Sequence, residues 1–487
     1  MLRPCLTRAQ NANAPGTARR TSGYVRPKHD ERAERLLGPT MSIDHAERTI
    51  SGIERSDSTI KITFDPGTDR LIGLGFTNGL LQVLTLGIYS AWAKTEVRRK
   101  LWSFTRLNGE PLEYTGTGRE LFIGFLIVFA LVLMPTFAGG AAISILLPGR
   151  ADAVTAYQFA VYTLFLFLVG NAFYRAQRYR LSRTQWRGIR GALVGSAGQY
   201  GWTYFWTLAG PAIFITAAAL LAAWSIGPDV GGTILLVGFI AALWILPWRA
   251  NKLQRMMTDA TRFGDRRVTY TGTSGPLYAR YLYAWAGSAV VILAAIAVSV
   301  QMIAASGAFQ VWMQTKQLPP LEDGAKLAAV WLSVLVLCAM ITASYRASQI
   351  RHFARNTHFE GASFRSSVAG PRLAWLILSN WLLRIGAIAT AIAAGSLLIY
   401  ITGAIPKPGT TDAARIGTAT LDVLLILVPI VVMSAVATAF AQFRSTRYLV
   451  SNLSLDGVVD IDAIMQNQDA APKRGEGLAQ VFDIDGF

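Results

Sequence analysis

The sequence predicts an all-α polytopic integral membrane protein with about eight to nine transmembrane helices. Three observations support this class: membrane-length apolar runs, basic residues concentrated in alternate connections, and an apolar composition. Of the 487 residues, 52% are hydrophobic and 15% are charged, and the mean hydropathy is +0.36. Such values are unusual for a soluble chain of this length. The runs do not alternate as barrel strands would, so the spans are expected to be helices.

Eight apolar runs are predicted to be transmembrane helices. Each is close to or above the roughly 18 to 20 residues that cross a hydrocarbon core of about 30 Å. They are Leu121–Leu147, Val154–Phe173, Phe205–Ile226, Val230–Trp248, Tyr281–Ala305, Ala325–Ser344, Ile385–Gly403 and Thr418–Phe440.

A further stretch, Leu71–Ala93, has the length of a span but contains Asn78-Gly79. Two interpretations are open. A re-entrant or interfacial hairpin leaves eight spans, whereas a ninth span places the N-terminus outside. The first is favoured, because a ninth span would carry twelve Lys and Arg residues outside without a signal.

The net charge of +17 follows the positive-inside pattern. The segments after Ala93, Phe173, Trp248, Ser344 and Phe440 hold 29 of the 46 Lys and Arg residues, and the four connections of opposite parity hold five. The basic segments and the C-terminus are therefore expected in the cytoplasm. The expected partner is the lipid bilayer, with anionic headgroups at the basic loops, and not nucleic acid.

An internal repeat accompanies the spans. "YTGT" occurs at Tyr114–Thr117 and at Tyr270–Thr273, and each copy follows a short alternating run and precedes an apolar run. The predicted unit is a basic helix end, a short cytoplasmic β-hairpin and a helix that returns to the bilayer. The turn pairs are Asn108-Gly109, Gly264-Asp265, Glu360-Gly361 and Asp456-Gly457. Because single hairpins are marginally stable, we expect the copies to pair or pack together.

An aromatic residue followed by a cation ends the helix in each copy of the unit. This pattern is typical of membrane-interface anchors, in which the cation snorkels to the headgroups. The pairs are Trp92 and Lys94, Tyr174 and Arg175, Trp248 and Arg249, Tyr345 and Arg346, and Phe443 and Arg444.

Polar residues within the spans are candidates for function, because burying them in hydrocarbon is costly. They are Asn171 and Gln158 in one span, Arg384, and Asp422 in the last span. Arg384 is expected to snorkel to the cytoplasmic headgroups. Asp422 lies near the outer end of its span, where it is interfacial or serves a proton or cation path.

Catalytic and cofactor motifs are absent from the sequence. It has neither a glycine-rich phosphate loop nor a His-Glu-x-x-His pair, and its two cysteines, Cys5 and Cys338, lie in a polar tail and a predicted span. His352 and His358 lack a neighbouring carboxylate or thiol cluster. We therefore expect no enzyme activity, no cofactor and no metal site.

The stretch "GLLQVLTLGIYSAWAKTEVRRKLWSFTRLNGEPLEYTGTGRELFIGFL" (Gly79–Leu126) resembles the signature of the YjgN-like bacterial inner-membrane proteins, a domain-of-unknown-function family. The closing "GEGLAQVFDIDGF" (Gly475–Phe487) resembles that family's tail. The resemblance covers most of the chain from about Thr59. It implies a multi-pass protein of the bacterial cell inner membrane and assigns no activity.

The expected organisation has three parts: an N-terminal tail (1–58), a YjgN-like membrane domain (59–465) and a cytoplasmic C-terminal tail (466–487). The tail at 1–58 is either disordered or the product of a start assigned too early, with Met41 as the initiator. Two functions are open. One is a transporter or channel for a small solute or lipid, and the other is a non-catalytic scaffold or envelope-maintenance protein whose hairpins bind a partner. A polar cavity near mid-membrane would favour transport.

Overall fold

The computed structural model of the protein describes residues 60–65, 68–307, 314, 321–402 and 412–466. All of them belong to one structural unit, Ser58–Phe487. The predicted tails, 1–58 and the part of 466–487 beyond Gln466, lie outside the described residues.

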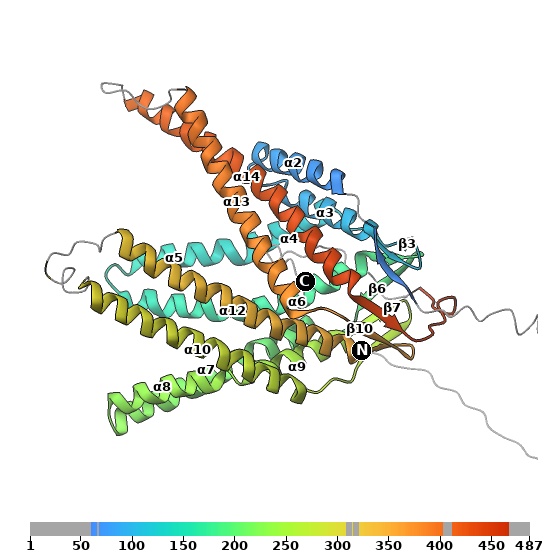
Figure 1. Cartoon of the computed structure of the whole chain (residues 1–487), viewed down its shortest axis with the longest axis horizontal. Helices are drawn as coiled ribbons and strands as arrows, with labels where there is room; N and C mark the ends of the chain where they lie inside the picture. The colour runs from blue at the N-terminus through green and yellow to red at the C-terminus, as the bar shows by residue number, and fades with distance from the viewer. Residues whose placement is uncertain (1–59, 66–67, 308–313, 315–320, 403–411, 467–487) are drawn as a thin grey trace, which may run out of the picture. The chain divides into compact units, whose positions relative to one another are not determined.

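Long helices dominate the structure (Figure 1). They are α2 (Thr68–Leu84), α3 (Ser90–Phe104), α4 (Gly118–Val128), the π-helix η1 (Phe129–Leu133), α5 (Met134–Leu146), α6 (Ala151–Arg183), α7 (Ala197–Ser225), α8 (Pro228–Ala242), α9 (Ile245–Asp259), α10 (Gly275–Ser306), α12 (Leu321–Arg355), α13 (Gly370–Thr402) and α14 (Asp412–Ser451). Among the described residues, seven helical runs are long and apolar enough to cross a membrane. The count is eight when α8 and α9, bent by 42°, form one span. Each overlaps one of the eight predicted spans, so the predicted polytopic membrane class is confirmed.

The stretch Leu71–Ala93 is not one straight helix. The chain turns between α2 and α3, where Leu86 and Gly87 have φ angles of 50° and 87°. Left-handed backbone suits Gly87 and breaks the helix. A broken helical pair is the arrangement that the re-entrant interpretation expects, rather than an unbroken ninth span.

Short strands connect the helices and lie together at one end of them (Figure 1). They are β1 (Ile62–Phe64), β2 (Thr105–Leu107), β3 (Glu110–Pro111), β4 (Glu113–Tyr114), β5 (Thr184–Trp186), β6 (Ile189–Leu193), β7 (Thr261–Phe263), β8 (Arg266–Tyr270), β9 (Thr357–Phe359), β10 (Ala362–Ser366) and β11 (Leu453–Asp456). All pairings are antiparallel. The last strand of each hairpin pairs with the first strand of the next, as β4–β5, β6–β7 and β8–β9. The hairpins therefore form a continuous succession, with β11 pairing to β10 at the end.

A hydroxyl side chain begins each hairpin by bonding back to the helix that precedes it. The Oγ1 atoms of Thr105, Thr184, Thr261 and Thr357 donate to the carbonyl oxygens four residues earlier, at 3.2, 2.8, 2.9 and 2.8 Å. Each bond satisfies a carbonyl that the end of a helix leaves without an amide partner. The hydroxyl position of the repeated unit therefore marks the change from helix to strand.

The hairpin turns have the backbone that their sequences require. Asn108-Gly109, Arg187-Gly188 and Glu360-Gly361 all have positive φ at both positions, between 48° and 86°. This geometry is that of the tight turn whose twist matches antiparallel strands. Asn108-Gly109 and Glu360-Gly361 are among the turn pairs expected from the sequence, whereas Arg187 is a residue type that is uncommon in left-handed backbone.

An arginine of the helix end also reaches across the hairpin to the segment that returns to the bilayer. Arg99 Nη2 donates to the Gly116 carbonyl at 3.2 Å, and Arg255 Nη2 donates to the Gly272 carbonyl at 2.9 Å. Arg351 donates likewise to the Val368 carbonyl. The two residues are 17 apart in every case. The contact closes each unit with a charge-assisted bond, and in two units the acceptor is the glycine of YTGT.

The tyrosine of the second YTGT is also built into the fold. Tyr270 donates its hydroxyl to Asn251 Oδ1 at 2.7 Å, while Asn251 Nδ2 donates to the Gly272 carbonyl at 3.2 Å. Burial raises the pKa of Tyr270 to about 12, so the phenol stays neutral and keeps its proton for this bond. The repeated motif therefore contributes to architecture.

The chain after β11 forms a strap, defined here as Val458–Gln466, that crosses the second and third hairpins. Met465 and Asp265 exchange hydrogen bonds of 2.9 and 3.0 Å, and Gln466 Nε2 donates to the Gly188 carbonyl at 2.7 Å. Val459 and Ile464 are buried against the strands. The strap thus supplies the sheet with an apolar cover that short strands need.

The first and last helices pack against each other through small residues. A Cβ atom at Gly79 of α2 would lie 2.7 Å from Val432 Cα of α14, and one at Gly75 would lie 3.0 Å from Val436 Cα. Only a glycine allows the two helix backbones to approach this closely.

This packing predicts that Gly79→Ala destabilises the protein by about 1–3 kcal/mol, because the added methyl group meets the backbone of α14. The measurement is the midpoint of thermal unfolding in detergent. Gly73→Ala is the matched control on the same helix, since nothing lies within 4 Å of a Cβ there. Equal midpoints for the two variants would contradict the close α2–α14 contact.

Candidate functional site

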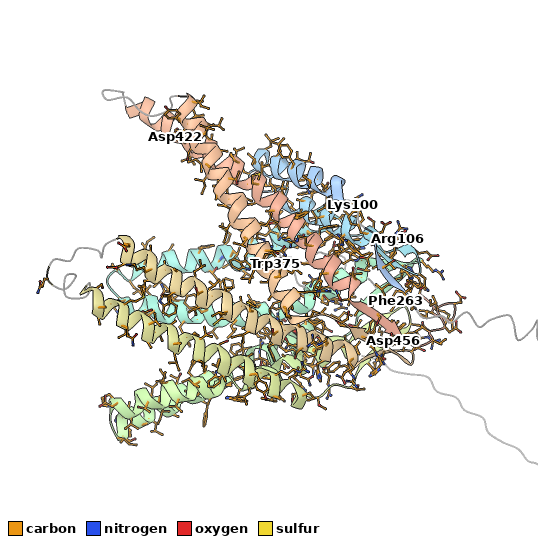
Figure 2. All side chains as sticks on the ribbon, viewed as in Figure 1. Lys100, Arg106, Phe263, Trp375, Asp422 and Asp456 are labelled. Carbon is orange, nitrogen blue, oxygen red and sulfur yellow. The ribbon has the colours of Figure 1, made fainter. Side chains whose placement is uncertain are left out.

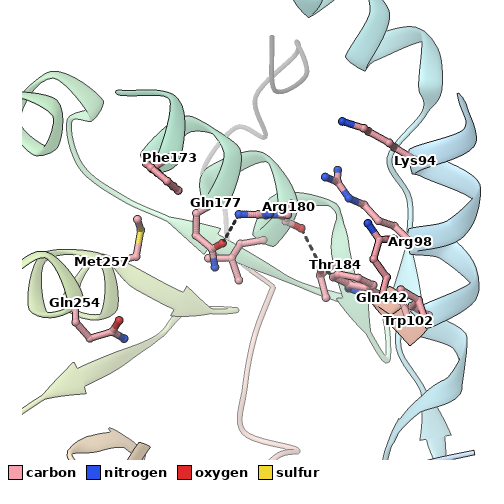
Figure 3. Close-up of a pocket in the computed structure, with 12 residues that line it drawn as sticks. Lys94, Arg98, Trp102, Phe173, Gln177, Arg180, Thr184, Gln254, Met257 and Gln442 are labelled. Carbon is pink, nitrogen blue, oxygen red and sulfur yellow. Dashed lines mark hydrogen bonds between the residues drawn. The ribbon is translucent and has the colours of Figure 1, made fainter. Parts of the chain in front are cut away.

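A cavity of about 550 Å³ lies at the strand end of the helices (Figure 3). We call it the basic cavity. Its walls come from α3, α6, α9, α14 and the start of β5. They are formed by Lys94, Arg98, Leu101, Trp102, Phe173, Gln177, Arg180, Leu181, Thr184, Gln254, Met257 and Gln442.

Equivalent positions of three units face this cavity. Arg98, Gln177 and Gln254 each stand seven residues before the hydroxyl residue that ends their helix. Because the strands hold these helix ends side by side, the same face of each helix is presented to one space. Sites between repeated units are common in multi-span transporters.

The basic cavity carries positive charge. Lys94, Arg98 and Arg180 line it, and none of the described residues in its wall is acidic. Arg180 Nη2 donates to Gln177 Oε1 at 3.1 Å (Figure 3). Trp102 Nε1 donates to Thr184 Oγ1 at 2.8 Å, which joins α3 to β5. A concave wall with one sign of charge concentrates ions of the opposite sign. The arrangement therefore suits an anionic group.

A second cavity, of about 370 Å³, adjoins the first between α2, α3 and α14. We call it the interhelical cavity. Lys94 and Gln442 line both, so the two spaces meet at these side chains. Asn78, Gln82, Ser434 and Thr438 add polar groups to its wall.

Asn78 is the most unusual residue of the interhelical cavity. Its side chain is 3% exposed, and neither its Nδ2 nor its Oδ1 has a hydrogen-bond partner in the part of the chain that the structure describes. The neighbouring Gly79 contacts Val432, near the middle of the apolar run Thr420–Ser451. An amide without partners at this depth is costly unless water or a ligand pairs with it.

The polar residues that the sequence singled out lie elsewhere. Asn171 is buried where α6 meets Gly201 of α7, and its Nδ2 donates to the Phe167 carbonyl at 3.0 Å. Gln158 and Arg384 are exposed on α6 and α13. Figure 2 places Asp422 toward the end of α14 that lies away from the strands. None of the four lines either cavity, and their functional roles stay predictions.

The expected interface anchors divide into exposed and buried residues. Trp248, Arg175 and Arg346 are exposed, as headgroup contact requires. The side chains of Tyr174 and Phe443 are each only 2% exposed, so they pack inside the protein instead of facing headgroups.

Several of the other aromatic and basic residues that were expected to be interface anchors contact side chains of the protein itself. Arg249 stacks over the Tyr204 ring at 4.2 Å, and Arg444 donates to Asn380 Oδ1 at 3.0 Å. Lys94 lines both cavities, Trp92 lies 5.5 Å from the Phe122 ring, and Tyr345 lies 5.4 Å from the Tyr281 ring. The helix-end pattern therefore contains cavity and core residues as well as anchors.

Sequence reasoning did not find Asn78, Gln442 or Gln177 as site residues. The sequence did contain a feature that could have identified Asn78, because this polar residue interrupts an apolar stretch. The two glutamines lie on basic helix ends, where polar residues are ordinary, and only the folded chain brings them together.

The comparisons with known proteins agree with this architecture. The family described as "Bacterial protein of unknown function (DUF898)" matches residues 59–481. A relative, "Inner membrane protein YjgN" of Salmonella typhimurium (strain LT2), is 36% identical over 85 residues, which cover 18% of this chain and 21% of the relative. No solved structure matches the chain.

The match to the relative spans about a fifth of that protein's length. Together with the apolar helices, it supports a multi-pass location in the inner membrane. The family match covers most of the chain and confirms the resemblance seen in the sequence. The chain belongs to the DUF898 family of bacterial proteins of unknown function, which includes YjgN-like inner-membrane proteins.

Proposed function

We propose that the protein transports a small anionic amphiphile, such as an acidic lipid, through the basic and interhelical cavities. One observation carries the proposal. The unpartnered amide of Asn78 lies level with the middle of a span, in a cavity that meets the basic cavity at Lys94 and Gln442. A polar cavity at this depth is the feature that distinguishes a transporter from a scaffold.

The two cavities suit different parts of an amphiphile. The basic cavity offers Lys94, Arg98 and Arg180 to an anionic group. The wall of the interhelical cavity is largely apolar or small, with Val97, Ile430 and Ala439 among its residues. An apolar tail would lie there, while Asn78 would pair with a polar atom of the ligand or with water that accompanies it.

The break between α2 and α3 also favours transport. Substrate sites of many transporters lie at discontinuous helices, because an interrupted helix leaves polar groups within the membrane. Here both halves of the broken pair line the interhelical cavity. The proposal assigns no catalytic step and requires no metal ion.

Removing the positive charge of the basic cavity should reduce transport. We expect Lys94→Gln and Arg98→Gln each to slow the transfer of fluorescent phosphatidylglycerol between leaflets of proteoliposomes by roughly tenfold, because each loses a charge-assisted contact. The measurement is the rate at which dithionite bleaches inner-leaflet probe. Arg175→Gln is the control, since Arg175 is exposed and does not line the cavity.

The result for phosphatidylglycerol is compared with that for fluorescent phosphatidylcholine and with protein-free liposomes. We expect the protein to transfer phosphatidylglycerol faster than phosphatidylcholine and faster than protein-free liposomes do. The Lys94→Gln and Arg98→Gln variants should lose this difference. Rates equal to those of protein-free liposomes would argue against lipid transport and would favour the scaffold alternative, in which the hairpins bind a partner.

Water should reach Asn78 from the basic cavity. In a variant without Cys5 and Cys338, we expect Asn78→Cys to react with a charged thiol reagent roughly ten times faster than Phe76→Cys, because only a hydrated thiol forms the reactive thiolate. Phe76 is a suitable control, since it lies two residues away on α2, is 56% exposed and lines neither cavity, so that its side chain would face lipid instead of cavity water. Equal rates of labelling would show that no aqueous path reaches Asn78.

A further inference from the structure

A third cavity, of about 490 Å³, lies between α10, α12 and β10, apart from the residues of the proposed transport path. We propose that this arginine cavity binds a phosphate group. Its wall contains Arg280, Arg351, His352, Arg355 and Arg365, and no acidic residue is among the part of the wall that the structure describes. The site does not depend on whether the chain transports anything.

Three of these side chains are held by the protein. Arg351 donates to the Val368 carbonyl, and Arg365 Nε lies 2.9 Å from Asp456 Oδ2. His352 Nε2 lies 2.9 Å from the Thr273 carbonyl oxygen, which can only accept, so this nitrogen carries a proton. These bonds orient the basic wall without a ligand.

Arg280 and Arg355 differ from the other arginines of the cavity. Both are exposed, and within the described ranges neither has an acidic partner. They come from α10 and α12, on two sides of the same space. Two guanidinium groups from separate helices in the wall of one cavity fit an anion whose oxygens point in several directions, which phosphate provides.

Ser348 is an independent indication of a ligand. Its side chain is 6% exposed, it lines the cavity, and its Oγ has no hydrogen-bond partner among the described residues. A buried hydroxyl normally has a partner, and a phosphate oxygen would accept its proton. The positive-inside rule accounts for basic residues at this end of the helices, but it does not account for an unpartnered buried hydroxyl beside them.

The phosphate has two possible sources. α10 begins its apolar run at the cavity, with Pro276 and Leu277 in the wall, so a lipid phosphate at the headgroup level can reach the arginines. A soluble phosphate can enter from the water at the same level. The chemistry of recognition is the same in both cases, and the experiment separates them.

The test uses the full chain in neutral detergent and in nanodiscs. Inorganic phosphate is titrated against the detergent-solubilised protein by thermal shift. Retention of phosphatidylglycerol over phosphatidylcholine is measured on nanodisc protein by native mass spectrometry. We expect Arg280→Gln and Arg355→Gln each to weaken binding about tenfold and Ser348→Ala to weaken it less.

Arg267→Gln is the matched control, because it removes the same charge at a residue that is exposed on β8 and lies outside the cavity. Binding of inorganic phosphate that is lost in the two arginine variants supports a site for soluble phosphate. Selective retention of phosphatidylglycerol that is lost in the same variants supports a lipid site. No binding of either probe, or an equal loss in Arg267→Gln, overturns the proposal.

Discussion

The backbone pairing between successive hairpins is the constraint on which the rest of the structure depends. Every described strand has only two to five residues, and an isolated hairpin of that size is marginally stable. Pairing of each hairpin with the next turns weak elements into a continuous antiparallel succession from β4 to β11. Because a helix enters and leaves each hairpin, this pairing also sets the distance between neighbouring helix ends.

The cavities follow from that arrangement. The hydroxyl bond at the end of each helix and the arginine bond across each hairpin give successive units the same local geometry. Equivalent faces of α3, α6 and α9 consequently point into one space, where Arg98, Gln177 and Gln254 meet. The close contact of α2 with α14 then places Asn78 beside that space, level with the middle of the apolar run Thr420–Ser451. The pairing of successive hairpins therefore determines both the arrangement of the helices and the position of the cavities.

The sequence was sufficient for the spans and for turn pairs such as Asn108-Gly109 and Glu360-Gly361, whereas no strand follows Asp456-Gly457 among the described residues. Apolar length identifies a membrane helix because the bilayer sets that length, and Asn108-Gly109 identifies a tight turn because few residues adopt its backbone. The sequence could not separate Tyr174 and Phe443 from true interface aromatics, since a buried ring and a headgroup ring occupy the same position in the pattern.

The site was harder to predict for a similar reason. Its residues come from helices far apart in the chain, and each one alone has an ordinary local context. Asn171 and Asp422 attracted attention because they lie within apolar runs, but a side chain at membrane depth can serve packing as well as transport. Only the pairing of the hairpins shows which polar residues share a cavity.

A disulfide between neighbouring hairpins tests this central constraint most directly. Ala192 of β6 and Arg262 of β7 are directly paired although they belong to different units, 70 residues apart by their numbers. In a chain without Cys5 and Cys338, mild oxidation of the Ala192→Cys/Arg262→Cys variant in native membranes should form an intramolecular disulfide, detected by a mobility shift that a reductant reverses. The Ala192→Cys/Arg365→Cys variant, with its second cysteine on β10, should form none. Failure of the first pair to cross-link, or equal cross-linking of both, would contradict the continuous sheet and the helix arrangement derived from it.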